Sequence, residues 1–189
     1  QTLRQKKPKQ YKVEFKGKMP FGVTAKDLVL ALIGKIGTAG GTGCALEFCG
    51  EAIRSISMEG RMTICNMAIE AGARSGLIAP DQTTIDYITA EDRPFAPKDE
   101  ALDKAIEYWS TLHSDEDAVF DKTLVIDVEK IEPQVTWGTS PGMVTGVNQR
   151  VPELDAVPEY SPDDVRAALD YMGLEPGMKM TDIKVEAVF

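Results

Sequence analysis

The sequence lacks the features that are typical of membrane-spanning proteins and of secreted, disulfide-rich proteins. Its longest purely apolar run, Leu28 to Ile33, is far shorter than the ~20 residues of a membrane-spanning helix, and no signal-peptide pattern opens the chain. The only cysteines, Cys44, Cys49 and Cys65, are odd in number and close together, so we do not expect a secreted disulfide framework. These absences predict a soluble protein of a reducing compartment, for which we choose the cytoplasm.

Charge and length narrow the function classes further. The net charge of −9 argues against a nucleic-acid binder or a protein of anionic membranes. At 189 residues, with 43% hydrophobic and 27% charged residues, the chain is long enough for one globular domain with a sizeable core and an appended segment.

One segment departs from the acidic balance. Between Arg4 and Lys18 the chain carries seven basic residues against the single acid Glu14. A basic arm that binds phosphates is one interpretation. A solvated terminal segment is favoured, because Tyr11 and Phe15 are the only aromatic residues among these basic residues.

Strand and helix patterns alternate along the chain and predict an α/β fold. Thr24 and Asp27 form a capping-box pattern at the start of an apolar helix that Gly37 ends. Asp81 and Ser161 are further predicted N-caps, and Gly173 is a predicted helix end. We expect strands at residues 11–15, 44–49, 75–80 and 122–128, and an apolar helical stripe formed by Leu102, Ala105, Ile106, Trp109 and Leu112.

The stretch from Ser57 to Gly76 is predicted to be one helix, and two polar residues interrupt its apolar pattern. Asn66 and Glu70 are four residues apart, so on a helix they lie one turn apart on the same face. If apolar neighbours buried these two side chains, the Asn66 amide by itself would cost roughly 2 to 7 kcal/mol unless it were hydrogen-bonded. A structural network and a polar cavity that holds a ligand both satisfy this requirement. The neighbours expected to be buried are Met62, Ile64, Cys65, Met67, Ala68 and Ile69.

Three other features suggest chemistry but have simpler explanations. The glycine-rich loop from Gly37 to Gly43 fits neither nucleotide-binding fingerprint, and a tight turn that lets two elements approach is favoured. The cysteine spacing C-x4-C-x15-C matches no common zinc or iron–sulfur pattern, so buried inert thiols are favoured. His113, the only histidine, is expected to face solvent near a helix end.

The loop from Trp137 to Gly142 has two possible roles. Its Thr-Ser-Pro-Gly sequence favours a turn, and loops of this kind often form the rim of a site. Plain packing of Trp137 is the favoured alternative.

Several motifs together resemble the aconitase superfamily, most closely the large subunits of bacterial-type 3-isopropylmalate dehydratases. The central motif is GRMTICNMAIEAGA, from Gly60 to Ala73. The supporting segments are GGTGCALEFCGEAIRSISMEG before it, LIAPD after it, and AKDLVLALIGKIGTAGGTG, PQVTWGTSPG and ALDYMGLEPG elsewhere. The resemblance covers practically the whole chain.

The resemblance implies a fold and a domain division. It implies a three-layer α/β/α domain over residues 11–150, preceded by a truncated lead-in segment, 1–10. Residues 151–189 would hold a linker, a helix and the start of the strand that leads to the cluster-binding segment. The first residue is not Met and the last residues read as a strand that has just begun, so we expect an internal piece of a longer protein.

The resemblance also implies a chemistry and its site residues. Family members interconvert 2-isopropylmalate and 3-isopropylmalate by dehydration and rehydration, with a [4Fe-4S] cluster as Lewis acid and a small subunit as partner. Asn66 matches the family's active-site asparagine, and Glu70 matches its glutamate near the reacting hydroxyl. The cluster cysteines are expected beyond Phe189, so no cofactor-binding or metal-binding residue is assigned here and this segment alone is expected to be inactive. A homoaconitate or methylmalate hydro-lyase large subunit and a non-catalytic interaction module remain alternatives.

Overall fold

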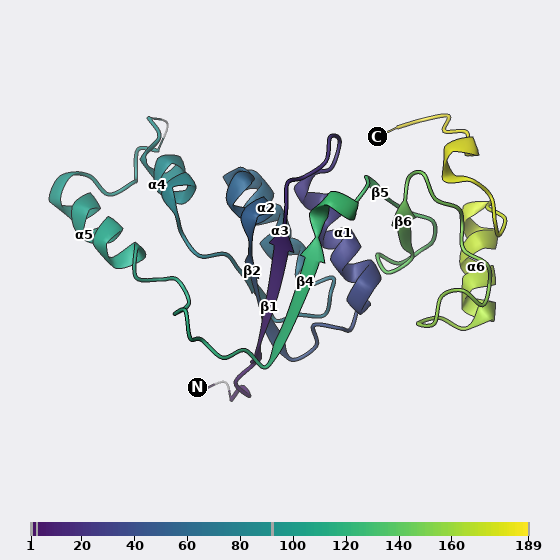
Figure 1. The fold of residues 1–189 in the computed structure, drawn as a ribbon, viewed down its shortest axis with the longest axis horizontal. Helices are drawn as coiled ribbons and strands as arrows, with labels where there is room; N and C mark the ends of the chain where they lie inside the picture. Colours follow the sequence, from purple (N-terminus) through teal and green to yellow (C-terminus); the bar gives the residue numbers. More distant parts are fainter. Residues whose placement is uncertain (1, 3, 92, 189) are drawn as a thin grey trace.

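The centre of the molecule is a four-stranded parallel sheet (Figure 1). The computed structural model describes residues 2, 4–91 and 93–188. Its strands lie in the order β3-β2-β1-β4, and each neighbouring pair is parallel. They are β1 (Lys9–Lys16), β2 (Cys44–Cys49), β3 (Ser75–Leu77) and β4 (Lys122–Asp127). The predicted α/β fold class is confirmed.

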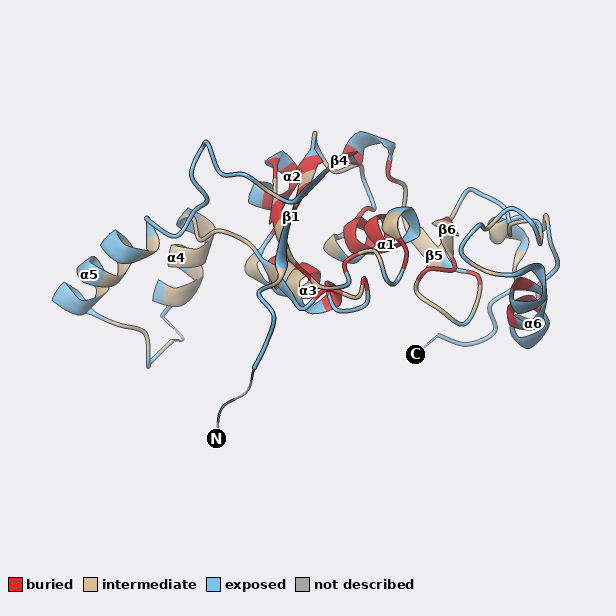
Figure 2. Cartoon of the chain, turned by 90° about the horizontal axis from the view of Figure 1, so that it is seen from below, coloured by how far each residue is buried: buried red, intermediate tan, exposed pale blue. Residues whose placement is uncertain are grey.

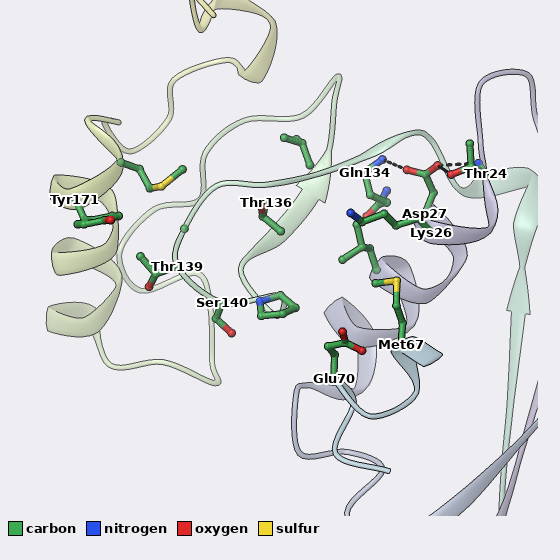
Figure 3. A pocket seen from close by; sticks show the side chains of 15 residues that line it. Thr24, Lys26, Asp27, Met67, Glu70, Gln134, Thr136, Thr139, Ser140 and Tyr171 are labelled. Carbon is green, nitrogen blue, oxygen red and sulfur yellow. Dashed lines mark hydrogen bonds between the residues drawn. The ribbon is translucent and has the colours of Figure 1, made fainter. Parts of the chain in front are cut away.

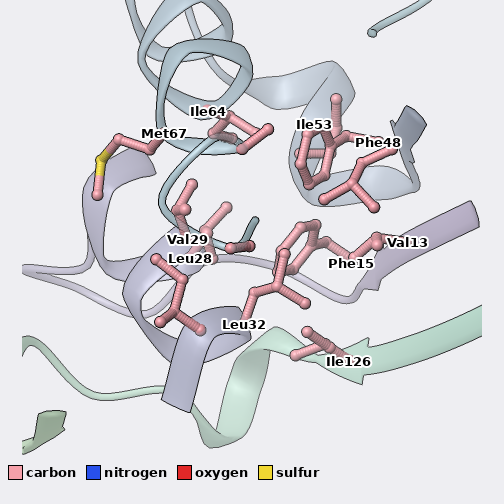
Figure 4. Close-up of a cluster of buried hydrophobic side chains, with 14 of the residues drawn as sticks. Val13, Phe15, Leu28, Val29, Leu32, Phe48, Ile53, Ile64, Met67 and Ile126 are labelled. Carbon is pink, nitrogen blue, oxygen red and sulfur yellow. The ribbon is translucent and has the colours of Figure 1, made fainter. Parts of the chain in front are cut away.

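One face of the sheet is apolar and three helices cover it. Alternate side chains of β1 and β2 point into this core, which is why both strands read as period-two patterns. The covering helices are α1 (Ala25–Ile36), α2 (Glu51–Ser55) and α3 (Met58–Met67). Figure 4 shows Val13, Phe15 and Phe48 packed against Leu28, Leu32, Ile53 and Ile64, and Figure 2 shows that buried residues concentrate here.

The opposite face of the sheet is polar. Lys12 and Glu47 lie on it, and the segment that precedes β4 crosses over them. Ser114 Oγ donates to Glu47 Oε2 at 2.6 Å, and Lys12 Nζ lies 5.6 Å from the Phe120 ring centre. His113, in the same segment, is exposed as predicted.

The predicted caps of α1 and α6 (Pro162–Met172) are confirmed. Thr24 is the N-cap of α1, and its backbone N and Oγ1 both donate to Asp27 Oδ2 at 2.7 Å. Gly37 ends this helix. Ser161 accepts from the Asp164 amide at the start of α6, and Gly173 ends that helix in the left-handed region at φ 67°.

Several predicted elements differ from the structure. The helix expected over residues 57–76 ends at Met67, and residues 68–72 form turns. β3 is shorter than expected, and Leu77 is 51% exposed, so this strand is not buried. The structure assigns no strand to residues 183–188, while Phe189 lies outside the described residues.

The helices that follow β3 lie apart from the sheet core. α4 (Gln82–Thr89) and α5 (Asp99–Trp109) extend to one side in Figure 1, and neither contains a buried residue. The predicted apolar stripe of α5 is therefore only half-covered. Among the described residues, no helix combines the length and apolar character needed to cross a membrane.

A second hydrophobic cluster lies on the other side of the core. After the short 3-10 helix η1 (Val128–Lys130), strands β5 (Gln134–Thr136) and β6 (Val144–Gly146) form an antiparallel hairpin. Trp137, in the loop of this hairpin, is 1% exposed and packs with Met143, Val151 and residues of α6. Another 3-10 helix, η2 (Met180–Asp182), follows.

A buried ion pair ties α3 to the start of α4. Arg61 Nη1 and Nη2 donate to the two carboxylate oxygens of Asp81 at 2.6 and 2.8 Å. The Arg61 side chain is 4% exposed, and Nη2 also donates to the Arg54 carbonyl. Asp81 is at the same time the predicted N-cap of α4, where it accepts from the Thr84 amide. One carboxylate thus serves both helices.

We expect Asp81→Asn to lower the free energy of unfolding by about 2 kcal/mol. The substitution keeps a cap acceptor for Thr84 but leaves the buried Arg61 guanidinium without its counter-charge. The expected loss of unfolding free energy is smaller than for a fully buried ion pair, because the Asp81 side chain is 35% exposed. Urea unfolding measures it, with Asp103→Asn, on the exposed surface of α5, as the control. Equal stability of the two variants would contradict this role.

The loss of stability caused by Asp81→Asn should depend on pH. The hydrogen bonds from Arg61 hold the pKa of Asp81 below its ordinary value of 3.8. A carboxyl whose pKa is lower in the folded state contributes stability above its unfolded pKa and loses it as pH falls through the folded pKa. The difference between wild type and Asp81→Asn should therefore be constant near neutral pH and shrink below pH of about 4.

Candidate functional site

An open groove of about 880 Å³ runs between α1 and the β5–β6 hairpin. Met67 and Glu70 form one side of it, and Thr139 and Ser140 of the hairpin loop lie opposite (Figure 3). Residues at the start of α1, in β5 and at the end of α6 complete the lining. These further residues include Thr24, Lys26, Asp27, Gln134, Thr136, Tyr171 and Met172.

The two predicted site residues occupy different places. Glu70 lines the groove, whereas Asn66, in the last turn of α3, does not. Both are exposed, and Met62 and Ile69 beside them are 46% and 64% exposed. The premise that an apolar environment buries Asn66 and Glu70 is therefore wrong, and neither needs an internal partner. Their catalytic roles stay predictions.

The turn that carries Glu70 is held by the glycine-rich loop. The Gly72 amide donates to the Ile69 carbonyl at 2.8 Å, and Gly72 has φ +80°, a conformation that favours glycine. The Gly41 amide donates to the Ala71 carbonyl at 2.8 Å, and a Cβ on Gly41 would lie 2.9 Å from that oxygen. The prediction that this loop lets two elements approach closely is confirmed.

A buried carboxylate connects α1 to the hairpin across the groove. Asp27, 8% exposed, accepts from the Gln134 amide through Oδ1 at 2.7 Å, while Oδ2 binds Thr24 (Figure 3). The capping-box pattern predicted the second contact. The first joins residues 107 positions apart in the chain, so no local pattern could have indicated it.

The hairpin loop is preorganised by its own hydrogen bonds. The Trp137 amide donates to the Met143 carbonyl and the Met143 amide to the Ser140 carbonyl, both at 2.9 Å. Ser140 Oγ lies 3.0 Å from the Tyr160 hydroxyl. Trp137 is packed inside, which confirms the favoured interpretation. The loop also lines the groove, and its role as the rim of a functional site stays a prediction.

The groove combines carboxylates, one ammonium and several hydroxyl groups, which suit a polar ligand. The side chain of Glu70 makes no hydrogen bond or ion pair with any other described residue, so its carboxylate is available to exchange a proton with a ligand. Lys26 supplies an ammonium, and Thr136 and Thr139 supply hydroxyl groups. Such a set can bind a hydroxy acid and move a proton on it.

The cysteines do not suit an iron–sulfur cluster. Cys44 lies on the core face of β2, where its Sγ approaches the Thr42 carbonyl at 3.7 Å. Burial raises the pKa of the Cys49 and Cys65 thiols, which disfavours the thiolate form that metals bind. Within the described ranges, no three histidine, cysteine, aspartate or glutamate side chains are grouped to hold a metal ion.

Comparison with known protein families gives one match over the full length of the chain. The model of the family described as "Aconitase family (aconitate hydratase)" matches residues 1–189. The match includes the parallel sheet, the turn with Glu70, the hairpin loop and α6, so all sides of the groove fall within it.

Asp27→Ala should release the hairpin from α1. Hydrogen bonds to a charged acceptor contribute about 1.5 to 3 kcal/mol, so we expect the Gln134 amide to exchange its hydrogen at least about tenfold faster. Hydrogen exchange followed by NMR or mass spectrometry measures this. Thr24→Val is the matched control, because it removes a capping donor and retains the Asp27–Gln134 bond. Unchanged exchange in Asp27→Ala, or an equal rise in Thr24→Val, would refute the connection.

Proposed function

Because this chain belongs to the aconitase family, whose members are in general hydro-lyases, we propose that it is part of the large subunit of a 3-isopropylmalate dehydratase. The proposed reaction interconverts 2-isopropylmalate and 3-isopropylmalate in leucine biosynthesis. The Cys-Asn-Met-x-x-Glu motif at residues 65–70 and the segment PQVTWGTSPG support this choice. Homoaconitate and methylmalate hydro-lyases share the first motif and are the alternatives within the class.

The observation that supports a catalytic role best is the position of Glu70. Its carboxylate faces an open groove and is held by a turn that two glycines shape. Dehydration breaks the C–O bond of the hydroxyl and a C–H bond of the neighbouring carbon, forms a C=C bond and releases water. We assign to the Glu70 carboxyl the donation of the proton with which the hydroxyl leaves as water, and to a base elsewhere in the complete enzyme the removal of the C–H proton. In rehydration the oxygen of water adds to the neighbouring carbon and one of its protons returns to the Glu70 carboxylate, while the base gives its proton to the carbon that lost the hydroxyl.

Other groove residues would bind the substrate. Lys26 carries the positive charge that a carboxylate of the substrate requires, and the hydroxyls of Thr136 and Thr139 can donate hydrogen bonds to it. Asp27 is assigned a positioning role, since its bond to Gln134 sets the distance between α1 and the hairpin.

The cofactor and the partner subunit are proposed for the complete enzyme and not for this segment by itself. Since the cysteines of this chain do not suit a [4Fe-4S] cluster, we assign the cluster to other parts of the large subunit and base no step on it. The small subunit would complete the site as a heterodimer and recognise the side chain of the substrate, in the cytoplasm.

Glu70→Gln in the complete two-subunit enzyme should lower kcat about 100-fold or more, within the range for a lost acid–base group. The free energy of unfolding should change by less than about 0.5 kcal/mol, because the side chain is exposed. Turnover of 2-isopropylmalate and urea unfolding are the two measurements.

The matched control is Glu107→Gln, which removes an exposed carboxylate from α5, outside the groove. It should change neither quantity. An unchanged kcat in Glu70→Gln would return Glu70 to a structural role. Faster turnover of homoaconitate or methylmalate than of 2-isopropylmalate by the wild-type enzyme would select the corresponding alternative.

A further inference from the structure

Five basic side chains surround a small cavity at the edge of the sheet where the strands begin. The cavity has a volume of about 190 Å³, and its lining contains no acidic residue. Thr42, Gly43 and Cys44 complete its lining. The five basic residues, named here the cationic cavity residues, are Lys6, Lys7, Lys9, Arg74 and Lys122.

The parallel sheet brings these residues together from three parts of the chain. Lys9 and Lys122 are the first residues of β1 and β4, and Tyr11 pairs with Lys122 between the strands. Arg74 immediately precedes β3, and its amide donates to the Cys44 carbonyl at 2.8 Å. Arg74 Nη1 also donates to the Lys6 carbonyl at 3.1 Å, which holds the basic N-terminal segment over the cavity.

The charges of the cavity are not compensated within the described part of the chain. None of the five has a carboxylate within 4.0 Å, whereas Lys16, Lys104 and Lys130 each have one. Asp121, the sequence neighbour of Lys122, accepts from the Gln10 amide at 2.7 Å. The five side chains are exposed. Like charges around one cavity repel, and a bound anion would reduce this repulsion.

We propose that this cavity binds a compact, multiply charged anion of the phosphate class, such as a phosphate or pyrophosphate group. A single carboxylate would offset only one of five positive charges. Lysine ammonium groups act as point charges for phosphate oxygens, and Arg74 adds a planar donor. Gly43, at φ +75°, has no atom within 4 Å of the position of a Cβ, so there is open space beside its Cα, while its carbonyl accepts from the Lys9 amide at 3.0 Å.

The cationic cavity is separate from the catalytic groove. The two share no lining residue, so the binding of the anion does not depend on the proposed hydro-lyase function. The volume restricts the occupant to a small group, which favours a phosphate or pyrophosphate over an extended polymer.

Isothermal titration of the intact protein with pyrophosphate at physiological ionic strength tests the proposal. We expect saturable binding with one site per chain. The triple variant Lys7→Gln/Lys9→Gln/Lys122→Gln should bind at least about tenfold more weakly, since each lost charged contact weakens binding. These side chains donate no hydrogen bond to other described residues.

Two further variants make the result decisive. Lys98→Gln/Lys179→Gln/Lys184→Gln removes the same charge from exposed positions outside the cavity and should bind as wild type does. Lys7→Arg/Lys9→Arg/Lys122→Arg retains the charge and should retain binding, which separates loss of charge from loss of folding. Glu70→Gln should also bind normally, so failure of the hydro-lyase proposal would be recognised separately.

Three outcomes would overturn the proposal. They are no saturable binding by wild type, equal affinity of the two glutamine variants, and tighter binding of a single-stranded RNA oligonucleotide than of pyrophosphate through the same three lysines. The last outcome would assign the surface to nucleic acid instead.

Discussion

The parallel pairing of β1 with β2 and of β2 with β3 determines where every other feature of this molecule lies. Parallel neighbours require a crossover, so α1 and α3 must each run back across the sheet to the edge where the next strand begins. The two return connections, residues 37–43 and 68–74, therefore meet at that edge. Their contact, the Gly41–Ala71 hydrogen bond, places the turn that carries Glu70.

Elements with local signals could be predicted from the sequence. The caps at Thr24, Asp81 and Ser161 involve residues three positions apart, and β1 and β2 alternate because one face of the sheet is covered. The end of α3 at Met67 was not predicted, because residues 68–71 are compatible with a helix. These residues form a turn in which the Ala71 carbonyl accepts from the Gly41 amide, a contact between distant residues that no local pattern indicates.

The candidate site, too, could be predicted only in part from the sequence, because the path of the chain after Met67 is not evident from it. Spacing alone put Asn66 and Glu70 on one buried helical face, and the motif of the family singled out the same pair. The turn after Met67 separates them, so Glu70 reaches the groove while Asn66 does not line it. Which face of α3 is covered depends on where α1 packs, and the apolar periodicity alone does not indicate it. Met62, in α3, and Ile69, in the turn that follows, are apolar yet exposed.

The basic segment near the start of the chain shows how topology changes the meaning of a charge pattern. In the linear sequence, Lys6, Lys7 and Lys9 look like a solvated arm, because a flexible run of lysines spreads its charge into water. Parallel strands begin at the same edge of a sheet, so basic residues at the starts of two other strands join that arm: Lys122 does so from β4 and Arg74 from the position before β3. The strand order β3-β2-β1-β4 thus concentrates positive charge at one edge of a chain whose net charge is −9. Because the remaining residues of the chain are strongly acidic, this concentration does not follow from composition but from the topology of the sheet.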